Sequence, residues 1–240
     1  MYMKLIILIL VIIILAYITY DASIFITEPF TQCDYDHGSL NVNDLTDLKN
    51  LLIKLTEFFT TQNITYFGDG GTALGTIRSG GLLPFDDDID LGIFQSDATL
   101  EKIDDYNDVE YYFEPIYFGY KFKRKNSKLF IDIMVYQINE DNIKYEIINN
   151  SWPDHYINKT EIYPLIIHKY SDIDMPLLNK CKERLDRTYP DWETTIKLDC
   201  GHGDEIRDTS TCINAKMGLP TEFNVNDYDK KYACYVPFPS

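Results

Sequence analysis

The stretch from Tyr66 to Phe94, YFGDGGTALGTIRSGGLLPFDDDIDLGIF, constrains the fold of this chain more than any other. It opens with a short apolar segment and a glycine-rich turn, and it ends with acids inside an alternating apolar pattern. This order predicts a strand, a tight turn, a short helix over 72–78 and a second strand that begins near Asp88. Because glycine lets a ligand approach the backbone closely, the turn is suited to hold a phosphate at the helix N-terminus.

The acids at the end of this stretch have a spacing that points to metal binding. Alternate residues of a strand share a face and lie about 6.6 Å apart, so Asp88 and Asp90 face one side. Ile89, Leu91 and Ile93 then face the other side, towards the core. Carboxylates held this close repel one another unless water or a hard cation neutralises them, and magnesium prefers oxygen ligands and substrate phosphates. The stretch therefore predicts a phosphate-and-metal site, with a solvated acidic loop as the alternative.

The segment from Gly71 to Asp90 resembles the signature of the LicD family, which includes the fukutin-related proteins. That signature is G-x-L-L-G-x-x-R-x-G-G-h-I-P-W-D-D-D-h-D, where h is apolar. The chain matches it at Gly71, Leu74, Gly75, Arg78, Gly80, Gly81, Pro84, Asp86, Asp87, Asp88 and Asp90. Ala73 stands where Leu is usual, and Phe85 where Trp is usual. The resemblance implies an α+β fold with a nucleotidyltransferase-like mixed sheet flanked by helices.

The resemblance also implies an activity. LicD-like enzymes transfer a phospho-substituted group, such as phosphocholine or a polyol phosphate, from a CDP-activated donor onto a glycan or glycoprotein. On this interpretation Gly70, Gly71 and Thr72 cradle the donor phosphates. Arg78 then either contacts the donor or fixes the loop.

A third acid lies in the strand predicted over 128–138, KLFIDIMVYQI. Asp132 stands at its centre, where an acid is costly unless it is paired or binds a metal. By the resemblance, Asp132 joins Asp88 and Asp90 as a catalytic residue. It either completes the ligand shell of Mg²⁺ or Mn²⁺ or accepts the proton of an acceptor hydroxyl. The alternative is an edge-strand acid that faces water.

One basic run precedes Asp132. It is formed by Lys121, Lys123, Arg124 and Lys125. It is either a solvated hairpin tip or a contact for donor phosphates or an acidic acceptor.

The N-terminal residues are almost uniformly apolar from Leu5 to Tyr20, with Lys4 before them and Asp21 after them. This pattern predicts a transmembrane signal anchor over 1–22 that leaves the domain, as in a type II membrane protein, in the secretory-pathway lumen or outside the cell. A cleaved signal peptide is the alternative. We expect a linker over 23–42, a LicD-like domain over 43–195 and a cysteine-containing C-terminal extension over 196–240.

The net charge limits the classes of binding partner, and the cysteine content limits the possible disulfide and zinc sites. The formal net charge of −16 argues against nucleic acid, and it makes a divalent cation close to a requirement for binding a polyanionic donor. The five cysteines are Cys33, Cys181, Cys200, Cys212 and Cys234, and none forms a CxxC pair. Structural thiols or a disulfide are therefore favoured over a zinc site at Cys200, His202 and Cys212.

Other local patterns complete the sequence. Asn43 or Asp44 is predicted to cap a helix that runs to about Thr61. Its buried face consists of Leu45, Leu48, Leu52, Leu55 and Phe59. N-glycosylation sequons occur at Asn63, Asn149 and Asn158, and the one at Asn63 is expected to be the least used because it abuts a buried strand. The segment with Arg187, Tyr189, Asp191 and Trp192 resembles the family's distal R-x-Y-G-D-W motif, with Pro190 in place of Gly.

Two further functions remain open. A sugar-nucleotide glycosyltransferase uses an Asp-x-Asp pair with a metal in the same way. An inactive, metal-binding partner of a transferase would retain the same fold.

Overall fold

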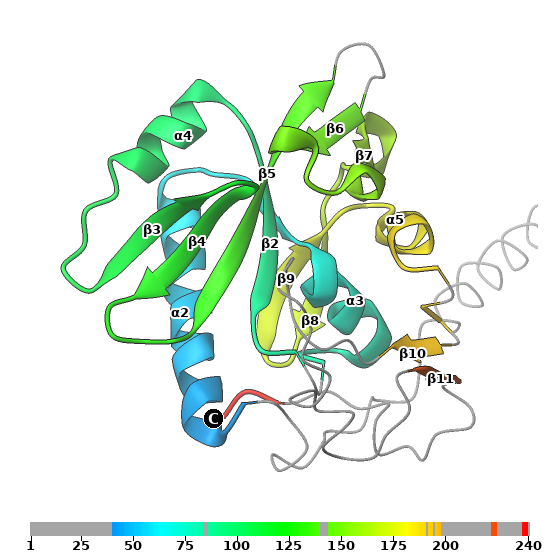
Figure 1. The fold of residues 1–240 in the computed structure, drawn as a ribbon, viewed down its shortest axis with the longest axis horizontal. Coiled ribbons are helices and arrows are strands. Elements are labelled where there is room, and N and C mark those ends of the chain that lie inside the picture. The colour runs from blue at the N-terminus through cyan, green and yellow to red at the C-terminus, as the bar shows by residue number, and fades with distance from the viewer. Residues whose placement is uncertain are drawn as a thin grey trace, which may run out of the picture. The chain divides into compact units, whose positions relative to one another are not determined.

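The computed structural model describes residues 40–83, 86–139, 144–190, 192–193, 195–197, 222–224 and 237–239. Its centre is a seven-stranded mixed sheet with the order β1-β2-β5-β4-β3, which β6 and β7 extend beyond β5 (Figure 1). The strands are β1 (Tyr66–Gly68), β2 (Ile89–Phe94), β3 (Tyr111–Ile116), β4 (Gly119–Arg124), β5 (Phe130–Asn139), β6 (Lys144–Ile147) and β7 (Ile157–Asn158). The β2–β5 pair is parallel and the other pairs are antiparallel. The predicted α+β class with a mixed sheet is thus confirmed.

Helices pack around this sheet. They are α2 (Val42–Thr61), α3 (Gly70–Ser79), α4 (Asp97–Asp104) and α5 (Cys181–Thr188). α2 packs against β4 and β5, whereas α3 packs against β2 and α5 (Figure 1). Two small hairpins complete the described chain: β8 (Ile166–Tyr170) with β9 (Ile173–Leu177), and β10 (Thr195–Lys197) with β11 (Glu222–Asn224).

The apolar periodicity of α2 predicted its buried face correctly. Its five expected core residues are fully buried: Leu45, Leu48, Leu52, Leu55 and Phe59. The helix begins slightly earlier than expected, because Asn41 and not Asn43 or Asp44 is the N-cap. The Asn41 side chain accepts hydrogen bonds from the backbone N–H groups of Asn43 and Asp44.

Strand alternation also predicted which side of β2 is buried. Ile89, Leu91 and Ile93 each have 0% exposure and belong to the same core cluster as the α2 stripe. On the opposite face, Met134 and Tyr136 of β5 pack with Phe67 in a second buried cluster. The sheet therefore has one face covered by α2 and a second face on which the acids of β2 and β5 lie.

Several sequence predictions fall on other parts of the chain. The predicted anchor over 1–22 lies outside the described residues, as do Cys33, Cys200, Cys212, Cys234 and the zinc alternative. Within the described ranges, no helix combines the length and apolarity needed to cross a membrane. Cys181 is a buried free thiol whose pKa burial raises to about 12.

The C-terminal residues 237–239 return to the domain core. Phe238 is 5% exposed and its ring lies 5.8 Å from that of Tyr170. The carbonyl of Pro239 accepts a hydrogen bond of 2.9 Å from Lys49. Part of the predicted extension over 196–240 therefore packs with the domain.

The sequon residue Asn63 lies in the turn after α2, has a positive φ of 54° and is exposed. That this sequon is the least used of the three stays a prediction. Asn158 is the sequon residue whose amide is engaged most fully: it donates to Glu161 at 2.6 Å and accepts from the Glu161 backbone in a capping box.

Candidate active site

The parallel pairing of β2 and β5 brings the predicted acids together. Asp90 lies directly opposite Asp132 in the register, and Asp88 immediately precedes β2. One carboxylate oxygen from each of Asp88, Asp90 and Asp132 lies within 4.8 Å of the others. We call these three residues the acidic triad. Asp86 and Asp87 form a second such group with Asp88, so that Asp88 is shared between the two groups.

The acidic triad lies in a poorly solvated place. Asp88 is 3% exposed, and the side chain of Asp132 is 13% exposed. Burial raises the pKa of Asp90 well above its usual value, and the charges of Asp88, Asp86 and Asp132 raise it further. Crowded, buried carboxylates are unfavourable unless a cation compensates them. Three carboxylates that can each give one oxygen are a ligand set suited to a hard divalent ion.

Gly70 and Gly71 let the helix begin directly against these acids. A Cβ on Gly70 would lie 2.4 Å from Asp90 Oδ2, and Gly70 also has a positive φ of 45°. A Cβ on Gly71 would lie 2.5 Å from Asp86 Oδ2. Any larger residue would therefore push the carboxylates away from the helix N-terminus.

The first turn of α3 binds Asp90 directly. The Gly71 N–H donates a hydrogen bond of 2.7 Å to Asp90 Oδ2. The Asp90 N–H in turn donates to the Thr72 hydroxyl at 2.8 Å. The positive end of the helix dipole therefore stabilises one carboxylate of the triad. Gly71 and Thr72, which were predicted to cradle the donor phosphates, thus lie beside the acids. In this structure both of them form hydrogen bonds with Asp90.

Arg78 lies in the last turn of α3. Burial lowers the pKa of Arg78 to about 10, while the charges of Asp86 and Tyr189 oppose that shift. Its positive charge therefore acts on Asp86, next to the acidic triad. Two roles are expected for Arg78, contact with the donor and support of the loop, and both stay predictions.

Lys121 is the member of the basic run that reaches the triad. Its Nζ lies 3.1 Å from Asp132 Oδ1, since the two residues are cross-strand neighbours in the β4–β5 register. Other members pair locally: Lys123 with Glu114 at 2.6 Å, and Arg124 with Glu110 at 2.6 Å. The basic run is thus mainly an ion-paired hairpin, with one lysine directed at the site.

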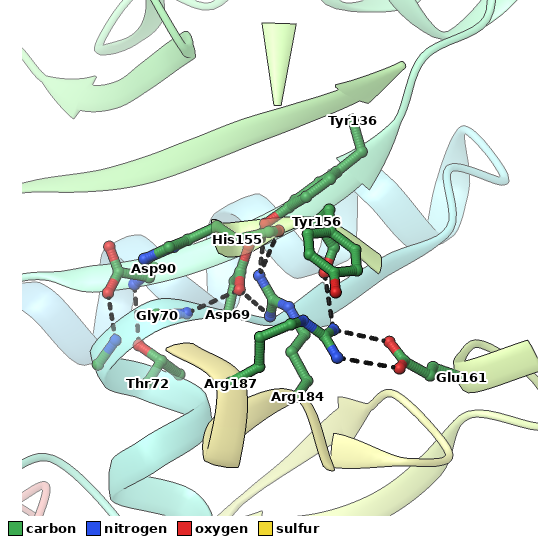
Figure 2. A network of polar contacts seen from close by, with 11 residues as sticks. Asp69, Gly70, Thr72, Asp90, Tyr136, His155, Tyr156, Glu161, Arg184 and Arg187 are labelled. Atoms are coloured by element: carbon green, nitrogen blue, oxygen red, sulfur yellow. Dashed lines mark hydrogen bonds and ion pairs between the residues drawn. The ribbon is translucent and has the colours of Figure 1, made fainter. Parts of the chain in front are cut away.

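A buried ion pair supports the start of α3, and sequence reasoning missed it. Asp69, the N-cap of α3, is 1% exposed and pairs with Arg184 of α5, which is 4% exposed. Tyr136 Oη donates to Asp69 Oδ2 at 2.6 Å, and the Gly70 N–H donates to Asp69 Oδ1 at 2.8 Å (Figure 2). The Asp69 N–H also donates to the carbonyl of Asp90 at 3.0 Å. These contacts tie β1, β5 and α5 to the glycine turn.

The electrostatics of this pair favour the charged forms of both partners. Burial alone would raise the pKa of Asp69, but the positive charge of Arg184 and hydrogen bonds from Arg184 and Tyr136 hold it below its usual value. Burial alone would likewise lower the pKa of Arg184, and Asp69 raises it instead. A charged pair in this place is stable only because both partners are present.

A second arginine of α5 anchors the distal motif. Arg187 donates to both carboxylate oxygens of Glu161, at 3.2 and 2.9 Å, and to the Tyr156 carbonyl at 2.9 Å (Figure 2). Trp192 Nε1 donates to Asp186 at 2.8 Å. Arg187 and Trp192, matched to the family's distal motif, therefore hold α5 in place instead of facing the acids.

An α+β domain with a glycine turn against strand acids agrees with the nucleotidyltransferase-like fold that the resemblance to the LicD family implies. Residues 63–179 match the family model described as LicD/FKTN/FKRP, nucleotidyltransferase domain. This match contains the Gly71–Asp90 motif and confirms its resemblance to the LicD family. The match supports a transferase of that family.

Curated relatives come from two Rickettsia species. The uncharacterized protein RT0683 of Rickettsia typhi (strain ATCC VR-144 / Wilmington) is 29% identical over 161 residues, which are 61% of this chain and 46% of the relative. The uncharacterized protein RP689 of Rickettsia prowazekii (strain Madrid E) is 29% identical over 152 residues, which are 61% of this chain and 55% of the relative. The chain therefore spans about half the length of these relatives.

Two solved structures are distantly similar. The lincomycin-bound crystal structure of the lincosamide antibiotic adenylyltransferase LnuA is 18% identical with a TM-score of 0.39, and the match covers 57% of this chain and 83% of that one. The solution structure of the antibiotic-resistance factor ANT(2'')-Ia is 20% identical with a TM-score of 0.30, covering 44% of this chain and 54% of that one. The assignment of this chain therefore depends on the family match and on its own site.

Proposed function

We propose that this chain is a metal-dependent phosphotransferase that moves a phospho-substituted group, such as phosphocholine or a polyol phosphate, from a CDP-activated donor onto a glycan. One observation carries the proposal: Asp88, Asp90 and Asp132 converge beside the N-terminus of a helix that begins with two glycines. That combination joins a ligand set for a hard cation with backbone N–H groups suited to an anion. The family match supports a transferase of that family, and the donor and acceptor are those that the resemblance of the Gly71–Asp90 motif implies.

The residues of this chain would divide the work as follows. Asp88, Asp90 and Asp132 hold Mg²⁺ or Mn²⁺, which when bound neutralises charge on the donor diphosphate and on the transferred group. Gly70, Gly71 and Thr72 line the phosphate side of the site. The bond between the transferred phosphorus and the CMP oxygen breaks, and CMP leaves with the bonding electrons. A new bond forms from that phosphorus to an acceptor hydroxyl oxygen, whose proton passes to Asp132 or to solvent water.

A donor screen tests this function. The purified full-length chain is incubated with CDP-linked donors, UDP-sugars and GDP-sugars, with and without magnesium, and the nucleotide products are quantified. We expect CMP release from a CDP-linked donor that EDTA abolishes. Release of UDP or GDP instead would support the glycosyltransferase alternative, and no metal-dependent release from any donor would contradict the proposed activity.

Replacing Asp132 with Asn is expected to lower the turnover of CMP release by about 10²-fold or more, the scale of losing a charged group at the reaction centre. Stability should change by less than about 1 kcal/mol, because removing one of several mutually repelling carboxylates offsets the loss of the ion pair with Lys121. Asp174→Asn is the matched control, since Asp174 pairs with Lys169 on the exposed β8–β9 hairpin. Normal turnover in Asp132→Asn would contradict a catalytic role for this residue.

A further inference from the structure

A row of charged residues crosses the sheet and ends at the acidic triad. In the strand register Glu114 of β3 lies opposite Lys121 of β4, Lys121 opposite Asp132 of β5, and Asp132 opposite Asp90 of β2. Residues paired across neighbouring strands direct their side chains to the same face. The row therefore places the Lys121 ammonium on the face of the sheet that carries the triad.

Lys121 is held against one carboxylate of the acidic triad. Its Nζ lies 3.1 Å from Asp132 Oδ1 and 3.4 Å from the centroid of the Phe130 ring, which adds a cation–π contact. Its side chain is 24% exposed. The ammonium therefore neutralises part of the triad's negative charge and contacts one of the two oxygens of Asp132, from which the triad offers a single metal ligand.

The chemistry of lysine suits an exchangeable contact. Its ammonium is a compact charge on a flexible four-carbon stem, with three donors that can turn to a new acceptor. Lys123, two residues along the same strand and on the same face, pairs instead with Glu114 at 2.6 Å. Of these two lysines on β4, Lys121 is paired with a triad carboxylate in the described structure and Lys123 is not. Lys123 is therefore a matched control for Lys121.

We propose that Lys121 is the resident counter-ion of the acidic triad: it neutralises Asp132 until a divalent cation takes that carboxylate, and its released ammonium then binds the phosphates of the nucleotide donor. This inference rests on the proposed function, because it needs a metal and an anionic donor at the same site. On this proposal the charge of Lys121 weakens the binding of the metal and strengthens the binding of the nucleotide. Removing that charge should therefore raise the affinity for the metal and lower the affinity for the nucleotide.

Titration calorimetry on the full-length chain tests both effects. In Lys121→Met, Mn²⁺ alone should bind about three- to tenfold more tightly than in wild type, the range for losing a partly buried competing charge. CDP added at saturating Mn²⁺ should bind about tenfold more weakly, since one charge-assisted contact to phosphate is lost. In Lys123→Met neither affinity should change by more than about twofold. Lys121→Arg keeps the positive charge and should stay closer to wild type in Mn²⁺ affinity.

The results separate this inference from the proposed function. Unchanged or weaker Mn²⁺ binding in Lys121→Met, with a wild-type melting temperature, would overturn the counter-ion role while leaving the transferase proposal in place. If Lys121→Met binds Mn²⁺ more tightly but binds CDP as wild type does, the released Lys121 ammonium does not contact the donor phosphates, and that part of the proposal is overturned. If the wild-type chain binds no Mn²⁺, the metal site fails, and the Lys121 proposal fails with it.

Discussion

Changing both Asp88 and Asp90 to Asn is expected to abolish the thermal stabilisation that Mn²⁺ and CDP together give the wild-type chain. A ligand that binds only the folded state stabilises it by about 2.7 kcal/mol at one hundred times its Kd. For a domain of this size that corresponds to a rise of roughly 5–10 °C in melting temperature. The double variant loses two of the three triad carboxylates, so neither the cation nor the nucleotide that depends on it should bind. CMP release should fall below detection.

The control for this experiment changes two aspartates that have the same spacing in sequence but lie outside the acidic triad. Asp172 and Asp174 are also two residues apart, and each forms an ion pair on an exposed part of the surface, with Lys49 and Lys169 respectively. Their double change to Asn removes the same charge and should leave the Mn²⁺ and CDP response intact. A wild-type response in the Asp88 and Asp90 double variant would show that the cation binds elsewhere.

Replacing Arg184 with Met is expected to lower the free energy of unfolding by about 3–5 kcal/mol, the cost of leaving a buried charge without its partner. Asp69 would remain buried at the N-terminus of α3, held by Tyr136 and the Gly70 N–H. Urea denaturation in the absence of metal measures the loss. Because Asp69 also contacts the Asp90 carbonyl, the variant should loosen the glycine turn as well.

Two further variants separate loss of charge pairing from loss of packing. Combining Arg184→Met with Asp69→Asn removes both charges and keeps an N-capping side chain, so it should recover at least half of the lost stability. Lys169→Met breaks an exposed ion pair and should cost less than about 1 kcal/mol. A loss below about 1 kcal/mol in the Arg184→Met single variant would contradict a structural role for the buried pair.

The parts of the site that sequence could predict are those set by local periodicity. Alternation in β2 identified Ile89, Leu91 and Ile93 as buried, and the interruption of apolar residues at Asp132 marked that acid. The register could not be predicted, because α4 and the β3–β4 hairpin separate β2 from β5 in the sequence, and local periodicity does not specify how distant strands pair. The placement of Asp90 opposite Asp132 is therefore a property of the folded sheet.

The missed features are tertiary. Arg184 is one of two arginines in the helix sequence CKERLDRT. Nothing in that sequence distinguishes it from the other charged residues, and its role follows only from the packing of α5 beside Asp69. The sequence predicted a helix from Thr72, whereas α3 begins at Gly70. Glycine has low helix propensity, but Asp69 caps the first turn and Asp90 accepts the Gly71 N–H. The N-cap acid between Gly68 and Gly70 was the available signal for this start.

The most direct test of the central claim is the anomalous diffraction of Mn²⁺ in crystals of this chain. We predict an anomalous peak among Asp88, Asp90 and Asp132, with one carboxylate oxygen of each at about 2 Å from the ion, the distance range for small hard divalent cations. Lys121 Nζ should then lie farther from Asp132 Oδ1 than the 3.1 Å of the present structure. A peak elsewhere, or no peak at Mn²⁺ concentrations that saturate the calorimetric signal, would contradict a metal-dependent site built from these three residues.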